Sequence, residues 1–302
     1  MGDTAGYGNS TNPGGGYTNS QNPPSPYGKN QTTAPQQKTS GPPLTSVRIH
    51  LCTADYDINR AVTNDDFIKY FIEGPEIQGV SQPTKPADPN MPNIPTLKLT
   101  RWAALNISLD VIRVAKDAAT IKNDLATSLS TAGAFVIYLG HSFIWTDSKK
   151  NPVKVLLNPA HVKKETKGYQ DWLISAGELT KMINSSNYKA GALLIASCSS
   201  SRCVGKITSK KKHVIGLDSG KNLVTAFSSM SFAIETVLDN ILGYQVVDPS
   251  KGYASRTIAI PTPQKTLKQA VELGDKALQY GGVTDKLIFL NGDGNFTFSL
   301  TP

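Results

Sequence analysis

The sequence predicts an α/β fold with a mostly parallel central sheet flanked by helices. Short apolar runs rich in Val, Ile and Leu alternate along the chain with segments of helical periodicity. Such runs are typical of buried parallel strands, and each connection between parallel strands needs room for a helix. With 39% hydrophobic and 18% charged residues, the chain can bury a sizeable core.

Residues 1–43 are predicted to form a disordered tail before one folded domain, residues 44–302. The tail consists mainly of Gly, Asn, Pro, Ser, Gln, Thr and Tyr and has almost no Leu, Ile or Val, so it cannot build a core. Tyr7, Tyr17 and Tyr27 are spaced along it. Aromatic residues in a polar background leave open a second role, as a weak assembly segment.

The first part of the domain alternates predicted strands and helices. Its predicted strands are residues 47–51, 109–114 and 134–139. Residues 63–72 are predicted to form a helix, because Asn and Asp side chains at its start can accept hydrogen bonds from free amides. Residues 117–129 place apolar side chains at helical spacing and predict another helix. Residues 80–97 are rich in proline and predict an irregular loop.

The second part of the domain continues this alternation. Its predicted strands are residues 153–157 (a strand or hairpin arm), 192–197, 214–217, 286–290 and 296–298. Its predicted helices are residues 175–183, 223–242 and 263–280. Ser175, followed three residues later by Glu178, has the pattern of a capping box and predicts the start of the first of these helices.

Two of the apolar runs end on reactive side chains. The run 134–139 is followed by Gly140 and His141, and the run 192–197 is followed by Cys198. A right-handed crossover through the helix between them can make these strands sheet neighbours. Functional groups gather beyond the carboxyl ends of parallel strands. An imidazole and a thiol at two such ends are the components of a Cys–His nucleophilic centre.

The residues around Cys198 are small and polar, with Ser197 before it and 199–201 after it. They predict a tight turn that exposes the thiol, and amides of such a turn can stabilise a thiolate and an oxyanion. A structural cysteine remains the alternative, although structural cysteines usually have apolar neighbours on both sides.

Two motifs resemble those of the caspase-like cysteine peptidases, most of all their CHAT and separase branch. They are Tyr138-Leu139-Gly140-His141 and Leu193-Leu194-Ile195-Ala196-Ser197-Cys198-Ser199-Ser200. The resemblance covers about residues 46–300 and implies a caspase-like three-layer sandwich with a mostly parallel central sheet. The tail is similar to metacaspase prodomains, although the Cys motif lacks their acidic residue two positions before the cysteine.

The resemblance implies a cysteine endopeptidase that acts on protein or peptide substrates and leaves room for an activating partner protein. Nothing in the sequence demands a metal or organic cofactor. His141 would act as general base and acid, and Cys198 would attack the peptide carbonyl. The amides of Cys198 and Ser142 would bind the oxyanion. Many relatives prefer a basic residue before the cleaved bond, which makes Asp55 and Asp218 candidates for substrate binding. Both also fit a helix cap or a turn.

Departures from the family pattern leave an inactive scaffold, which binds partners through its tail or its basic surface, as an alternative. Ser142 occupies a position where the family usually has Gly, and it would be strained if that position required positive φ. Serines up to Arg202 replace a further glycine after Cys198. A serine α/β-hydrolase is less favoured: Gly140–Ile144 imitates a nucleophile elbow centred on Ser142, but Ile144 stands where that elbow needs Gly.

The chain carries a net charge of +8 and has a pI near 9.2, which favours acidic partners in general. Its densest basic run, residues 210–213, is interpreted as a solvated loop. No nucleic-acid partner is expected, because arginines and aromatic residues do not alternate there.

Three cysteines, Cys52, Cys198 and Cys203, show neither a disulfide framework nor metal-ligand spacing. Cys52 and Cys203 are interpreted as packing thiols, and His161 and His213 as incidental. No secretory signal and no apolar run long enough for a membrane span are recognised. A reducing, cytoplasmic location is therefore predicted.

Overall fold

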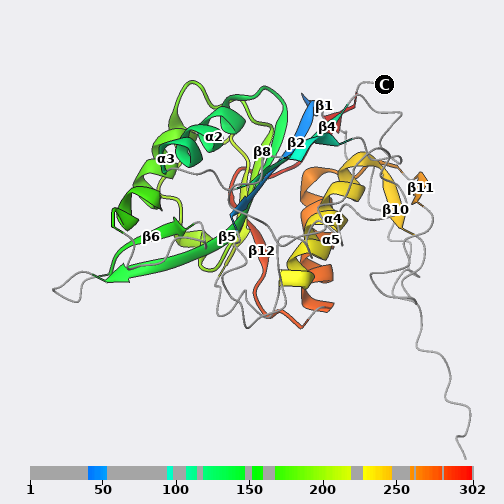
Figure 1. The fold of residues 1–302 in the computed structure, drawn as a ribbon. Helices are drawn as coiled ribbons and strands as arrows, with labels where there is room; N and C mark the ends of the chain where they lie inside the picture. Colours follow the sequence, from blue (N-terminus) through cyan, green and yellow to red (C-terminus); the bar gives the residue numbers. More distant parts are fainter. Residues whose placement is uncertain are drawn as a thin grey trace, which may run out of the picture. The chain divides into compact units, whose positions relative to one another are not determined.

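The computed structural model describes residues 40–52, 94–97, 107–113, 118–146, 152–158, 167–218, 227–246, 259–261, 263–280 and 282–300. All of them belong to one compact unit, Lys38–Pro302 (Figure 1). The predicted tail as far as residue 39, and the predicted helix at 63–72, lie outside the described residues.

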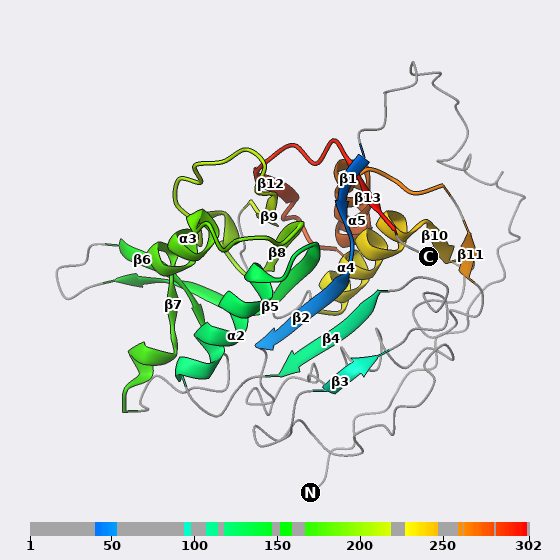
Figure 2. The same ribbon diagram turned by 90° about the horizontal axis from the view of Figure 1, so that it is seen from above.

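The described residues confirm the α/β class and build a largely parallel sheet. Its main strands, in spatial order, are β12 (Leu287–Asn291), β9 (Val214–Leu217), β8 (Ala192–Ala196), β5 (Ala134–Thr146), β2 (Ser46–Cys52), β4 (Ser108–Arg113) and β3 (Ile94–Leu97). The strands from β9 to β4 run parallel to one another, whereas β12 and β3 are antiparallel to their neighbours. Figure 2 shows these strands side by side.

Shorter strands extend this framework. The second half of β5 forms an antiparallel ribbon with β6 (Pro152–Asn158), which in turn pairs with β7 (Ile174–Ser175) (Figure 1). Two further pairs are β1 (Ser40–Pro43) with β13 (Thr297–Ser299), and β10 (Tyr244–Val246) with β11 (Ala259–Pro261).

Helices cover both faces of the sheet and give three layers (Figure 1). Helices α2 (Ala118–Ser130) and α3 (Ala176–Asn184) pack on one face, and α4 (Phe227–Leu242) and α5 (Leu267–Tyr280) pack on the other. Alternate residues of β5 point to opposite faces: Phe135 and Ile137 join the α4/α5 core, and Val136 and Tyr138 join the α2/α3 core. Because both faces are buried, the strands read as continuous apolar runs.

Helix starts follow from capping residues. The predicted capping box is confirmed: the Ser175 hydroxyl accepts a hydrogen bond from the Glu178 amide (3.2 Å), and the Glu178 carboxylate accepts one from the Ser175 amide (2.8 Å). The last predicted helix begins at Leu267 rather than at 263, because Thr266 and Gln269 form the same reciprocal pair of bonds (3.2 and 3.1 Å).

Two predictions about proline-rich segments are wrong. Ser40–Pro43, assigned to the tail, forms β1 beside β13, and the Leu44 amide donates a hydrogen bond to the Ser299 carbonyl (2.9 Å). Ile94–Leu97, assigned to an irregular loop, forms β3 at the edge of the sheet. An edge strand tolerates proline, because one side of it needs no hydrogen-bond donor.

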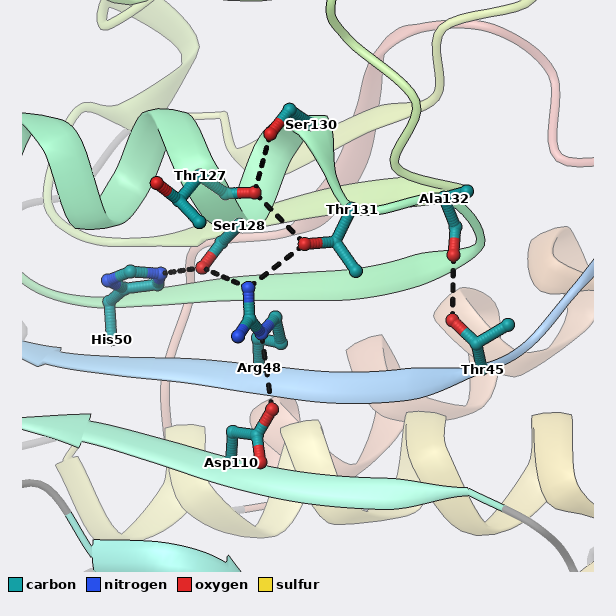
Figure 3. A network of polar contacts seen from close by, with 9 residues as sticks. All are labelled: Thr45, Arg48, His50, Asp110, Thr127, Ser128, Ser130, Thr131 and Ala132. Carbon is teal, nitrogen blue, oxygen red and sulfur yellow. Dashed lines mark hydrogen bonds and ion pairs between the residues drawn. The ribbon is translucent and has the colours of Figure 1, made fainter.

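A polar network joins β2 to β4 and to the end of α2 (Figure 3). The Arg48 guanidinium pairs with the Asp110 carboxylate (3.2 Å) and donates hydrogen bonds to the hydroxyls of Thr131 (2.9 Å) and Ser128 (3.4 Å). Ser128 also shares a 2.8 Å hydrogen bond with Nε2 of the buried His50. The network gives the buried His50 and Ser128 side chains hydrogen-bond partners between the sheet and α2.

His50 makes the stability of this network pH-dependent. Burial, assisted by the nearby Arg48 charge, lowers the pKa of His50 to about 3. Between about pH 6.5 and pH 3 the unfolded chain therefore binds a proton at this residue that the folded chain does not bind. We expect the free energy of unfolding to fall as the pH falls through this window, by about 1.4 kcal/mol per pH unit from this group. Urea unfolding at several pH values measures the slope, and His50→Gln should reduce it. Equal slopes in the two proteins would contradict this assignment.

Candidate active site

The sheet register brings the two reactive positions to corresponding places on neighbouring strands. Leu139 of β5 pairs with Ala196 of β8 in parallel register. His141 and Cys198 each follow two residues later. Paired strands lie about 4.8 Å apart, so both residues follow the same end of this ladder at corresponding positions. The backbone of His141 continues in β5 opposite Asn158 of β6, and its imidazole lies outside the described part of the chain.

Cys198 lies on a tight turn, as predicted. Strand β8 ends at Ala196, and the chain then turns into a short 3₁₀ helix, η3 (Ser200–Arg202). The Cys198 side chain is half-buried and packs against the edge of the α4/α5 core. The thiol therefore combines a fixed position with partial exposure, which a nucleophile needs.

Ser199 carries the backbone strain of this turn. Its φ of 52° and ψ of 29° are left-handed, and it is the one non-glycine residue with positive φ in the described ranges. Left-handed geometry is unfavourable for an L-residue by roughly 1–2 kcal/mol, and such strain clusters at functional sites.

The strain predicts opposite outcomes for two substitutions at Ser199. We expect Ser199→Gly to keep or raise the free energy of unfolding, by up to about 1 kcal/mol, because glycine adopts positive φ freely. Ser199→Val should lower it by about 1–2 kcal/mol, because a β-branched residue is disfavoured there. Denaturant unfolding compares them, and a valine variant as stable as the glycine variant would refute the strained turn.

Ser200 anchors the turn to β9, which sequence reasoning missed. Its buried hydroxyl accepts a hydrogen bond from the Leu217 amide (2.5 Å) and donates one to the Leu217 carbonyl (3.4 Å). The neighbouring Ser201 hydroxyl donates to the Asp218 carbonyl (2.7 Å). Gly216 makes room, because a Cβ there would lie 2.7 Å from the Ser200 oxygen. A glycine within the apolar run 214–217 was the available signal for this close approach.

Ser142 lies inside β5, opposite Leu157 of β6, and its side chain is buried. Its φ is not positive, so the strain expected from serine in place of glycine is absent. The alternative that Ser142 is the nucleophile of an elbow is wrong. Such an elbow needs a strand that turns sharply into a helix, whereas β5 continues as a strand through Ser142 to Thr146.

Cys203 is a packing thiol, as predicted, and is 1% exposed. Burial raises its pKa to about 12, although the nearby Ser142 and Ser197 hydroxyls act in the opposite direction. Neither hydroxyl has another partner with hydrogen-bond geometry in the described part of the chain. Of these three side chains, Ser142 directly follows His141, Ser197 directly precedes Cys198, and Cys203 follows the end of η3. Cys203 is protonated at neutral pH and does not compete with Cys198 as a nucleophile.

Of the two acidic candidates for substrate binding, the structure describes Asp218. Asp55 lies outside the described residues. Asp218 follows β9, is exposed, and is joined through its carbonyl to Ser201 in the turn after Cys198. Its carboxylate accepts a hydrogen bond from the Lys286 amide (3.0 Å) and so also serves the connection between β9 and β12.

The remaining candidates are His161, Cys52 and His213, of which the structure describes only the side chain of His213. His161 and the Cys52 side chain lie outside the described part. His213 packs on Phe296, with ring centroids 4.6 Å apart. Within the ranges given above, no three His, Cys, Asp or Glu side chains gather closely enough to hold a metal ion. In the same ranges, no helix combines the length and hydropathy needed to cross a bilayer.

Comparison with known proteins finds similarity only at the level of solved structures, and it is distant. No protein-family model matches the sequence, and no curated protein matches it. The crystal structure of the Drosophila initiator caspase Dronc is similar to 84% of the chain and matches over 84% of its own length. The sequence identity is 8% and the TM-score is 0.38.

Proposed function

We propose that the protein is a caspase-like cysteine endopeptidase, with Cys198 as nucleophile and His141 as its base. The single observation that supports this most is the pairing of Leu139 with Ala196, because each lies two residues before one of the reactive side chains. The strained turn at Ser199 and the half-exposed thiol agree with it. The strand pairing, the strained turn and the half-exposed thiol are features of this chain and do not depend on similarity to another protein.

In the proposed reaction, His141 accepts the thiol proton and the Cys198 sulfur attacks the peptide carbonyl. The oxyanion that forms is held by the amides of Cys198 and Ser142. Collapse breaks the C–N bond, and His141 returns the proton to the leaving amine. Water, deprotonated by His141, then hydrolyses the thioester and restores the thiol. No metal or organic cofactor is needed for these steps.

The finer assignments belong to the same proposal. Asp55 and Asp218 are the proposed acidic groups for a basic residue before the cleaved bond, and Asp218 has the additional support of its link to the Cys198 turn. Membership of the CHAT and separase branch and an activating partner protein are proposed from the motif resemblance, and a cytoplasmic location is proposed from the cysteine pattern.

The test combines turnover with labelling of the site. Purified full-length protein is assayed on fluorogenic peptides ending in Arg, Lys, Asp or Leu, and it is treated with an Arg-containing chloromethyl ketone followed by peptide mapping. We expect cleavage after Arg or Lys and covalent labelling at Cys198. Labelling without turnover would still support the nucleophile and indicate that the activating partner is missing. Neither turnover nor labelling at Cys198 would favour the inactive scaffold.

A further inference from the structure

The positive charge of the chain is concentrated in one segment that has no acidic residue. Between Glu178 and Asp218 lie 39 residues without Asp or Glu, which include seven Lys or Arg residues. The net charge of the whole chain is +8. A segment of this composition creates a strong positive field where the fold gathers its side chains on one surface.

The fold gathers most of these lysines around the carboxyl end of α3. We call the exposed set the lysine face, and it consists of Lys181, Lys189, Lys206, Lys210 and Lys211. Lys206, Lys210 and Lys211 belong to the loop between η3 and β9. That loop lies against the end of α3, where the Asn184 side chain donates a hydrogen bond to the Lys206 carbonyl (3.0 Å).

The backbone beneath the lysine face is held by specific contacts. The Lys212 ammonium donates hydrogen bonds to the carbonyls of Ile183 (2.5 Å) and Ser185 (3.0 Å) at the end of α3, and it lies 5.3 Å from the centre of the Tyr188 ring. A cation at a helix carboxyl end is favourable. The Asn291 side chain donates to the Ser209 and Lys212 carbonyls (2.8 and 2.5 Å).

These anchors distinguish the face from a simple solubilising run, because they present Lys210 and Lys211 on a fixed turn. A preorganised charged surface binds with a smaller loss of conformational entropy. Carboxylates near its members include Glu178, which pairs with Lys122 (2.9 Å), and Asp293, which interacts with His213.

The composition of the face selects among anionic partners. Its five members are lysines, and the exposed Arg202 of the same segment belongs to η3. The neighbouring aromatic residue, Tyr188, lies under Lys212 with a buried hydroxyl and offers no platform for stacked bases. Ile144 and Tyr280 are the exposed large apolar side chains of the described residues, and neither belongs to the face. It therefore lacks an apolar group for insertion into a bilayer. With nucleic acid and membrane excluded, the side-chain carboxylates of Asp and Glu are the anionic groups that fit the hydrated ammonium groups of these lysines.

We propose that the lysine face docks an acidic segment of a partner polypeptide. The occupant is not the chain's own tail, because residues 1–43 contain a single acidic residue, Asp3. The face also lies away from the candidate active site: the His213 carbonyl meets the Leu193 amide at the start of β8, whereas Cys198 follows the end of that strand. The two sites can be occupied together, and docking does not depend on the proposed peptidase activity.

The test measures binding of a fluorescent twelve-residue Glu/Gly peptide to the full-length protein by anisotropy. We expect binding that weakens by about tenfold between 50 and 300 mM salt. The double variant Lys210→Glu/Lys211→Glu should weaken it by at least about tenfold. The matched control Lys268→Glu/Lys276→Glu makes the same charge change at two exposed lysines of α5 and should change it less than about twofold.

Three outcomes would overturn the proposal. Equal losses in both double variants would mean that only net charge matters, and an unchanged affinity in Lys210→Glu/Lys211→Glu would mean that the face is not used. Tighter binding of a single-stranded oligonucleotide or of phosphatidylserine vesicles than of the peptide would assign the surface to another partner class. If the first variant does not fold, as judged by circular dichroism, Lys189→Glu/Lys206→Glu gives the same comparison on the same face.

Discussion

Replacing Cys198 by alanine is expected to reduce kcat/KM on the best fluorogenic peptide by at least about 10³-fold, while the melting temperature changes little. Alanine cannot form the thioester, so only the weak catalysis of binding and oxyanion contacts would remain. The side chain is half-buried at the core and alanine removes only its sulfur, which is why the fold should tolerate the change.

Cys203→Ala provides the matched control for this effect. It removes a second thiol five residues away, but that thiol is buried and its pKa is raised to about 12 by burial. We expect kcat/KM to stay within about tenfold of the wild-type value, because the loss is one of packing and not of chemistry. Retention of more than a tenth of the activity by Cys198→Ala, or an equal loss in both variants, would show that Cys198 is not the nucleophile.

Ser200→Ala is expected to lower the free energy of unfolding by about 1–3 kcal/mol. The substitution leaves the buried Leu217 amide without its hydrogen-bond acceptor and removes the tie between the Cys198 turn and β9. We also expect the alkylation rate of Cys198 to change, because its turn would no longer be fixed. Urea unfolding measures the stability.

Ser201→Ala is the control, because its hydroxyl donates to the Asp218 carbonyl at a solvent-exposed position. It should cost less than about 1 kcal/mol, since water can replace the lost donor. Equal stabilities of the two variants, or a Ser200→Ala protein as stable as wild type, would contradict the anchoring role.

The central strands could be predicted because burial on both faces leaves a local signal. Residues 214–217 were predicted at the bounds that β9 has, and 192–197 differs from β8 by one residue. The start of α3 could be predicted for a similar reason, because its capping box is formed by Ser175 and Glu178, three residues apart. Such elements depend on side chains within a few residues of each other.

The edges of the sheet could not be predicted in this way. Ser40–Pro43 pairs with β13 far along the chain, and Ile94–Leu97 pairs with the following strand β4; only this pairing makes the two proline-containing segments β1 and β3. Strand β5 continues beyond Leu139 because β6 offers a partner for its second half. Pairing depends on a partner strand outside the segment itself, so it leaves little mark on local composition.

In the candidate site, too, local features could be predicted and features that depend on another strand could not. That Cys198 leaves a strand on a tight turn was readable from its small polar neighbours. The strain at Ser199 and the anchoring of Ser200 on Leu217 depend on how the turn meets β9, which local sequence does not specify. Asp218 was chosen for its place after a strand, and its bond to Lys286 shows the turn role that was considered beside substrate binding.

The most direct test of the paired strand ends is the pH dependence of the rate at which iodoacetamide alkylates Cys198. The rate is measured by peptide mapping in the wild type and in His141→Ala. If His141 lies beside the sulfur, the wild-type rate should reach half its maximum well below the ordinary thiol pKa of about 8.5. The His141→Ala profile should then shift upward by at least about one pH unit. Identical profiles in the two proteins, centred at the ordinary thiol value, would contradict a functional pairing of His141 with Cys198.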